Sequence, residues 1–197
     1  MVRVAAGLVN SLTGASLVRM TDDRTRSDDD QVLPDSSPEQ PSVDAPRELT
    51  EERRAELVAA GIPEDLHAWL SRYGVGPLTV KMGIVFSELG AERTVATMPV
   101  EGNQQVAGIL HGGAHVVLAE TLGSFSAALH AGPGRQAVGI EVGATHHRSI
   151  ASGLVTGTAT AIHLGRTLTT HEVVMTDDQG RRLSTARITN MIRDVRA

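Results

Sequence analysis

The sequence predicts an α+β fold in which an antiparallel sheet wraps around one long helix. Residues 114–131 form a long apolar segment, and the turn-forming residues AGPG at 131–134 end it. Two strand-like runs precede this segment and four follow it, joined largely by short turns. Because a helix enclosed by a sheet is apolar on nearly all sides, packing this helix against the strands is the simplest arrangement.

The composition is that of one ordinary globular domain with a real core. The chain has 197 residues, a formal net charge of −5, 2% aromatic residues and no cysteine. Few aromatic rings and no general basic character argue against a nucleic-acid partner. The lack of cysteine excludes a disulfide framework, a thiolate metal site and a cysteine nucleophile. We expect a cytoplasmic protein without a bound metal or cofactor.

The N-terminal quarter differs from the rest. Residues 21–48 carry nine acidic residues against three arginines, and four prolines lie between Pro34 and Pro46. Such a stretch offers little apolar surface to offset the entropy of ordering, so we predict disorder over residues 1–47. The first 20 residues are too short and too polar to span a membrane, and a signal peptide is a weaker alternative to a flexible tail.

Two short helices are predicted over residues 48–75, ahead of a main domain over 76–197. Thr50 is placed to cap the first helix, which runs through Val58. Pro63 opens the second helix, PEDLHAWLSRYG. We expect one face of it to dock on the main domain or to cover a pocket, namely Leu66, Trp69, Leu70 and Tyr73.

The strands of the main domain are predicted from β-rich runs between turn residues. Turns are expected at Gly165–Arg166 and at residues 177–180, and a loop at 101–110 leads into the helix. The predicted strands cover residues 78–89, 93–100, 136–148, 153–164, 167–177 and 181–193.

Glu120 is the one carboxylate in the apolar helical segment. An unpaired buried carboxylate is costly, so it must be paired, hydrogen-bonded or used in chemistry. A structural carboxylate at a rim or a subunit contact and a catalytic one are both consistent with the pattern. Ser124, one turn further on, is placed to bond Glu120 or a water molecule beside it.

The motif His111-Gly112-Gly113 opens the same helix. Free N–H groups at a helix start suit a developing oxyanion, and glycine lets a carbonyl approach closely; a plain tight turn is the alternative. Glu120 lies eight residues beyond Gly112, or about 12 Å along a helix, so it does not reach a carbonyl held at its own helix start. A shared site therefore requires a dimer with two antiparallel helices.

Two basic motifs follow, THHRS at 145–149 and HLGRT at 163–167. Arg148 and Arg166 suit phosphate groups, although solvated basic loops are an alternative. A zinc site is disfavoured, because the adjacent His146 and His147 point to opposite faces of a strand.

Together, the stretches GILHGGAHVVLAETLGS, VGIEVGATHHRS and IHLGRT resemble the hotdog-fold acyl-CoA thioesterases over roughly residues 76–193. The likeness is to the branch of the Arthrobacter-type 4-hydroxybenzoyl-CoA thioesterases and the thioesterases of the enterobactin and menaquinone pathways. It implies a hotdog fold, an acyl-CoA substrate, no separate cofactor, and sites shared between the subunits of a dimer or a dimer of dimers.

The resemblance also implies roles for single residues. Glu120 would act as nucleophile or general base, the Gly112 N–H would bind the thioester oxygen, and Ser124 would position water. His111 and Gln105 would polarise or orient the thioester. Contacts to CoA are implied for His146, Arg148, Ser149, Gly165 and Arg166.

This chain departs from the family pattern at Thr145, where Asn is usual, and at Arg166, where a small hydroxyl residue is common. An aromatic acyl group is plausible by resemblance, with a pocket rim near Met82, Phe125, Leu129 and the helix of Trp69. A non-catalytic module that senses acyl-CoA is the alternative function. A hydratase acting on enoyl-CoA would need a differently placed Asp/His pair.

Overall fold

The computed structural model describes residues 48–195, so the disorder predicted for residues 1–47 lies outside the described residues. The helices are α1 (Glu51–Ala59), the 3₁₀ turn η1 (Glu64–Leu66), α2 (His67–Leu70), α3 (Pro77–Lys81) and α4 (Gly112–Ala131). The strands are β1 (Val85–Glu88), β2 (Arg93–Pro99), β3 (Arg135–His146), β4 (Leu154–Leu164), β5 (Leu168–Thr176) and β6 (Arg182–Asp194).

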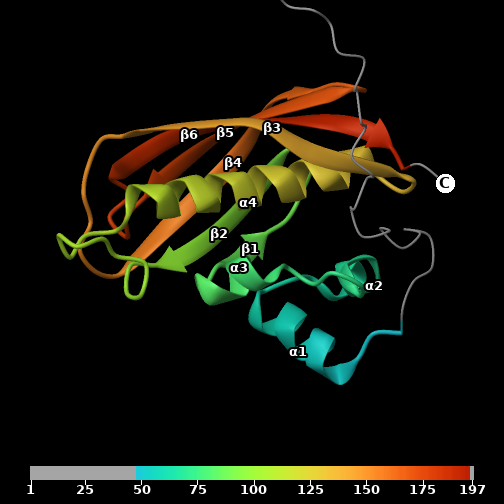
Figure 1. Cartoon of the computed structure of the whole chain (residues 1–197), viewed down its shortest axis with the longest axis horizontal. Helices are drawn as coiled ribbons and strands as arrows, with labels where there is room; N and C mark the ends of the chain where they lie inside the picture. The colour runs from blue at the N-terminus through green and yellow to red at the C-terminus, as the bar shows by residue number, and fades with distance from the viewer. Residues whose placement is uncertain (1–47, 196–197) are drawn as a thin grey trace, which may run out of the picture. The chain divides into compact units, whose positions relative to one another are not determined.

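The six strands form one antiparallel sheet in the order β1-β2-β4-β5-β6-β3. Helix α4 runs along one face of this sheet, and the helices α1–α3 lie on the other side of α4 (Figure 1). This is the predicted α+β arrangement, an antiparallel sheet around one long helix. In the part of the chain that the structure describes, no helix is long and apolar enough to span a membrane.

Helix α4 is long because its sequence supplies both a cap and an apolar body. The His111 side chain caps its start, and Gly132, with a φ of +71°, ends it. Gly123 lets the helix approach β6 closely, since a Cβ atom there would lie 2.2 Å from Cγ2 of Ile188. The core between helix and sheet includes Leu118, Ala119, Leu122, Met98, Val155, Val173, Met175 and Ile188.

The predicted turns are confirmed by their hydrogen bonds. The Gly165 N–H donates to the carbonyl of Leu168 over 2.9 Å in the β4–β5 turn. In the β5–β6 turn the Asp177 carboxylate accepts from the N–H groups of Gln179 and Arg181, and Gly180 has a φ of +74°. The cap of the first helix is confirmed too, because Thr50 Oγ1 accepts from the Arg53 N–H.

The prediction of a strand from residue 78 is wrong. Residues Pro77–Lys81 form helix α3, and β1 begins only at Val85. Proline at the first helical position is preorganised for a helix, and Gly83, with a φ of +66°, then redirects the chain. The β-branched Thr79 and Val80 favour a strand locally, but this contribution is overridden.

The second predicted helix is shorter than expected, and only part of its predicted face is buried: Leu70 lies in the core and Leu66 packs against it. Trp69 and Tyr73 are 45% and 59% exposed. His67 and Ser71, which the prediction did not place on this face, are buried as well. Nε2 of His67 bonds the carbonyl of Ile62 over 2.9 Å, so the helix turns its histidine inward and its large aromatic residues outward.

Candidate active site

Glu120 lies on the open side of α4. Within this helix Gly113 and Glu120 are the two exposed residues, so the expectation that the helix is buried nearly all round fails at the carboxylate. Glu120 lines a cavity of about 180 Å³ toward strand β3. It also lines a second cavity, of about 260 Å³, toward α3. The carboxylate therefore faces space at the edge of the protomer.

Ser124 does not bond Glu120 in the protomer. Its hydroxyl donates to Oδ1 of Asn190 at 3.5 Å, and the Asn190 amide reaches the Gly123 carbonyl at 3.4 Å. Ser124 and Glu120 nevertheless line the same 260 Å³ cavity. Asn190 is fully buried on β6. No local pattern could have indicated it, because it is 66 residues from Ser124.

The start of α4 carries one N–H group without a partner. The Gly113 N–H donates to Nδ1 of His111 over 2.8 Å. Among residues 48–195, no acceptor takes the Gly112 N–H. Because Nδ1 of His111 is an acceptor, the proton of the neutral ring sits on Nε2. The helix start therefore presents two donors, the Gly112 N–H and the His111 Nε2–H.

The loop that precedes the helix is held by Asn103. Its side-chain amide donates to the carbonyls of Met82 and Pro99, and its own carbonyl accepts from the His111 N–H. Gln105 lies on this loop with an exposed side chain, and its N–H donates to Ile109. The loop is thus anchored at Asn103, which sequence reasoning missed, and presents Gln105 outward.

His146 ends strand β3 beside the start of α4. Its Nε2 lies 3.0 Å from the position that a Cβ atom on Gly112 would take. The ring of His115 packs against it with centroids 5.1 Å apart. His115 is 4% exposed, and its Nδ1 lies 2.8 Å from Ser184 Oγ. Burial, and secondarily the neighbouring His146, lower the pKa of His115 to about 4. Its one-turn spacing from His111 was the available sequence signal.

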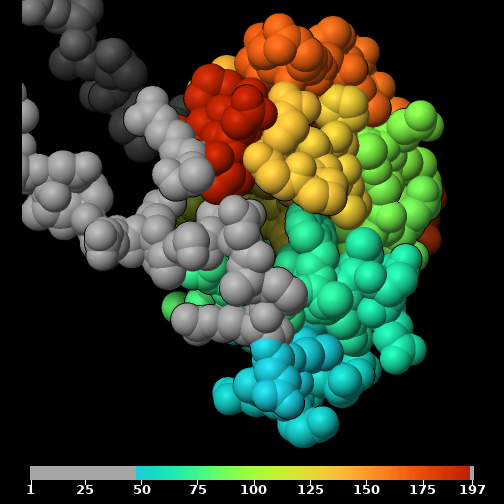
Figure 2. Space-filling model, turned by 90° about the vertical axis from the view of Figure 1, so that its right-hand side faces the viewer, coloured from blue at the N-terminus to red at the C-terminus, as the bar shows by residue number. Residues whose placement is uncertain are grey.

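The two basic motifs lie at opposite ends of the sheet. Arg148 and Ser149 follow His146 at the start of α4, and both are exposed. Gly165 and Arg166 lie beside the end of α4, where His130 Nε2 bonds the Gly165 carbonyl at 3.0 Å. Figure 2 shows this second end, with the 164–168 turn in orange, the start of β3 in yellow and the end of β6 in red.

The length of strand β3 gives the distance between the two basic motifs within one protomer. The Arg135 guanidinium donates to the Arg166 carbonyl, so the start of β3 lies beside the second motif. His146, at the other end of the strand, is eleven residues away. At roughly 3.3 Å per residue this is about 36 Å. A single protomer therefore does not bring the two motifs together.

The candidate pocket beside Glu120 is mainly apolar on its other walls. Leu78 and Thr79 of α3 line it together with Val117 and Phe125 of α4. The Phe125 ring is held by Phe86, with centroids 4.9 Å apart. Of the expected rim residues, Phe125 is in place, whereas Trp69, Leu129 and Met82 are not among the lining residues.

Proteins of similar sequence include thioesterases. Residues 107–184 match the family model of the thioesterase superfamily. The proofreading thioesterase EntH of Cronobacter sakazakii is 43% identical over 124 residues, which are 62% of this chain and 90% of EntH. The chain belongs to the thioesterase superfamily. It is accordingly a thioester hydrolase, as the sequence had indicated.

Solved structures of thioesterases share the fold. A Gln-to-Ala variant of a thioesterase from Pseudomonas aeruginosa superposes with a TM-score of 0.60 at 37% identity, over 67% of this chain and 94% of that chain. A thioesterase from Haemophilus influenzae gives a TM-score of 0.57 at 35% identity, over 59% and 82% of the two chains. The fold of this thioesterase is thus the predicted hotdog fold.

Proposed function

We propose that this thioesterase hydrolyses acyl-CoA to a free acid and CoA, at sites shared between the two subunits of a dimer. The observation that carries the proposal is the placement of two half-sites on α4. The helix start presents the Gly112 N–H, and Glu120 faces open space about 12 Å further along the same helix. Neither half is a complete hydrolytic site by itself.

The free edge of β3 supports the dimer. This twelve-residue strand is the last of the sheet and has β6 on one side. Long unpaired edge strands are usually covered or paired in native proteins. Antiparallel pairing of two β3 strands about a two-fold axis would run the two α4 helices in opposite directions. Glu120 of one subunit would then approach Gly112 of the other.

In the proposed reaction the thioester carbonyl binds at the helix start. The Gly112 N–H and the His111 Nε2–H donate to its oxygen, where negative charge develops. Glu120 of the other subunit either attacks the carbonyl carbon, forming an anhydride that water hydrolyses, or removes a proton from the attacking water. Gln105 orients the thioester, and Ser124 holds the water molecule. The thiolate of CoA leaves and takes up a proton.

The same two-fold axis explains the separation of the basic motifs. It places Arg148 and Ser149 of one subunit near Gly165 and Arg166 of the other, because the two β3 strands run antiparallel. His146 and the two arginines would then contact one CoA molecule from two subunits, with arginine forking onto phosphate oxygens. No cofactor other than the CoA portion of the substrate is part of this proposal.

The acyl group is proposed to occupy the 260 Å³ cavity beside Glu120. Its apolar walls, Leu78, Val117 and Phe125, suit a small aromatic or short aliphatic group. Because Phe86 holds the Phe125 ring in place, a long alkyl chain would require this wall to move. We therefore expect benzoyl-type thioesters to be better substrates than palmitoyl-CoA.

Release of free thiol from a panel of acyl-CoA thioesters tests this function. We expect turnover by the wild-type protein and loss of about 10²- to 10⁴-fold in Glu120→Gln, as for removal of a catalytic acid or base. Glu172→Gln, which removes an exposed carboxylate from β5, is the control and should retain full activity. Binding of acyl-CoA without any thiol release would instead indicate a sensor module.

Multiple-turnover hydrolysis in ¹⁸O-labelled water separates the two roles of Glu120. A nucleophilic carboxylate acquires the label over repeated turnovers, because water can open the anhydride at the Glu120 carbonyl. A general base does not. Mass spectrometry of the peptide that contains Glu120 reads out the difference.

A further inference from the structure

Three buried histidines lie in the described part of the chain, and one of them differs from the others. His67 and His171 each bond a backbone carbonyl, of Ile62 and of Ala91 respectively, and both leave Nδ1 without a partner. These contacts hold loops in place and touch no candidate site residue. His115 instead bonds a side chain, Ser184, and packs its ring on that of His146.

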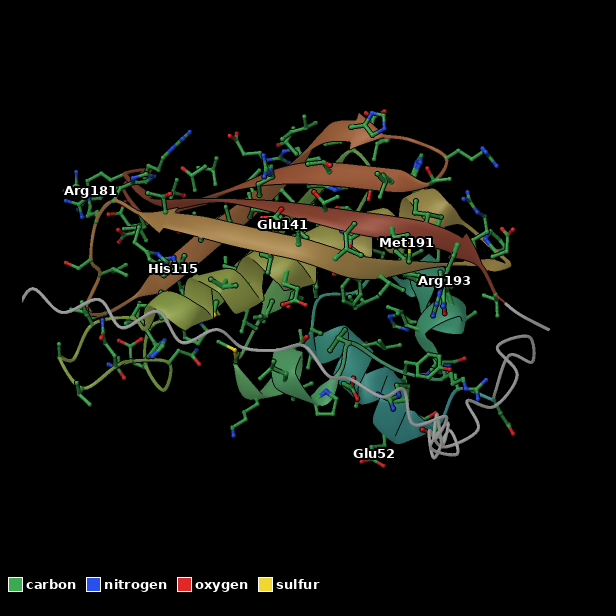
Figure 3. The ribbon with its side chains drawn as sticks, turned by 45° about the horizontal axis from the view of Figure 1, so that its top comes forward. Glu52, His115, Glu141, Arg181, Met191 and Arg193 are labelled. Atoms are coloured by element: carbon green, nitrogen blue, oxygen red, sulfur yellow. The ribbon has the colours of Figure 1, made fainter. Side chains whose placement is uncertain are left out.

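We propose that His115 is a positioning residue of the reaction, whose ring holds the His146 imidazole against Gly112 at the proposed oxyanion site. The proposal rests on the proposed function. It extends the site to a buried residue that touches no substrate and acts through His146. Figure 3 shows His115 on the N-terminal half of α4, beneath the sheet.

The contacts of His115 account for its own orientation. Ser184 Oγ lies 2.8 Å from Nδ1 of His115 and 2.6 Å from Sδ of Met175. A hydroxyl has one proton and two lone pairs, so Ser184 can serve both neighbours at once. Ser184 and Met175 are fully buried on adjacent strands. The ring of His115 is therefore anchored to the sheet and not only to its own helix.

Because the His115 ring is anchored, its contact with the His146 ring restricts the His146 side chain beside the start of α4. His146 is exposed at the end of β3, where a side chain without support would sample several rotamers. The ring of His115 forms one wall against it, at 5.1 Å between centroids and a tilt of 54°. Gly112 forms the other wall, since a Cβ atom there would lie 3.0 Å from His146 Nε2.

Burial also determines the charge of the His115 imidazole. With a pKa lowered to about 4, His115 is neutral at pH 7. The ring that packs against His146 therefore carries no positive charge at that pH. A leucine at position 115 would fill the core equally well but would offer no flat ring to His146.

A matched pair of variants tests the proposal, His115→Leu and His115→Phe. Both are apolar and lose the bond to Ser184, but only Phe keeps a ring. We expect His115→Leu to lower kcat roughly 10-fold, less than the full cost of an oxyanion donor, because the displaced His146 ring no longer packs against the Gly112 peptide. His115→Phe should stay within about 3-fold of wild type. In the His146→Ala background the Leu substitution should cost nothing further, because the two residues act as one unit.

Ser126→Ala is the control, a buried polar residue of α4 that bonds Thr94 over 2.8 Å. It should change stability without changing kcat. NMR of the His146 ring gives a readout independent of turnover. His115→Leu should shift its signals and broaden its rotamer distribution, whereas His115→Phe should retain one ordered state.

The outcomes separate the two proposals. Equal kcat in the Leu and Phe variants, or an undiminished Leu effect in the His146→Ala background, would overturn the positioning role while the function stands. If wild-type protein hydrolyses no acyl-CoA thioester, the proposed function fails. The NMR comparison then decides whether His115 orders His146.

Discussion

The two ends of α4 are built differently. At its start, the peptide N–H of Gly112 is left without a protein partner, and two imidazoles pack beside it. At its end, the nearby turn is tied down by side chains, since His130 and Arg135 bond the carbonyls of Gly165 and Arg166. The first end offers donors to a reacting group, and the second fixes the backbone of the turn that carries Arg166. The proposed hydrolysis of CoA thioesters uses both, and within one protomer the length of β3 keeps the two basic motifs about 36 Å apart.

Mixing two inactive subunits should restore activity, and this is the largest effect we expect. Glu120→Gln and Gly112→Pro each remove one half-site, and each should lower kcat by about 10²-fold or more. In a statistical mixture half of the dimers are mixed, and each mixed dimer has one intact site. Thiol release should therefore recover to about a quarter of wild type. If subunit exchange is demonstrated and thiol release still does not recover, the Gly112 and Glu120 half-sites must belong to the same chain.

Proline and alanine at position 112 isolate the N–H group. Gly112 is the first residue of α4, where proline is well tolerated but lacks an N–H. Alanine adds the same Cβ atom near His146 and keeps the N–H. We expect kcat of Gly112→Pro to fall about 10²-fold below that of Gly112→Ala, the usual cost of one oxyanion donor. Equal rates would mean that the peptide N–H does not bind the carbonyl oxygen.

Removing one arginine from each end should weaken CoA binding by smaller factors. We expect Arg148→Ala and Arg166→Ala each to raise KM for acyl-CoA roughly 10-fold, as for loss of a charge-assisted bond of about 1.5 kcal/mol. KM for the corresponding acyl-pantetheine, which lacks the nucleotide, should stay unchanged. Arg187→Ala is the control, because Arg187 pairs with Glu141. If only one of the two variants raises KM, the nucleotide of CoA contacts only that arginine and its motif.

Stability at acid pH should depend on two buried histidines, one on α4 and one on β5, and we expect no direct effect on the catalytic site from this dependence. Burial lowers the pKa of His115 to about 4 and also lowers that of His171. Between pH 6.5 and 4 the unfolded chain takes up protons that the folded chain does not, so the free energy of unfolding falls as the pH falls. For His115 the loss is on the order of 2–3 kcal/mol.

Thermal melts of wild type and His115→Phe across this range isolate that contribution. The variant should lose less stability between pH 6.5 and 4 than wild type, while both still lose the part due to His171. Parallel curves for the two proteins would show that His115 takes up its proton in the folded state at an ordinary pH.

The local chemistry of the sequence determined much of the fold. The apolar run, the histidine cap and the glycine stop are contacts within a few residues, and they correctly predicted α4 and its ends to within two residues. The turns at Gly165 and Asp177 follow from short-range bonds in the same way. Helix rise alone also separates Gly112 from Glu120, so the sequence by itself predicts a shared site.

Tertiary packing decided the rest, because it depends on which distant segments become neighbours. β3 follows α4 in the chain but pairs with β6 at the edge of the sheet, and this leaves Glu120 exposed and separates the basic motifs. Ser184 meets His115 across 69 residues, a contact that no local pattern encodes. Trp69 turned outward because a buried bond from His67 set the rotation of its helix. Spacing along the chain predicts what one element can do, whereas the sheet order decides what lies beside it.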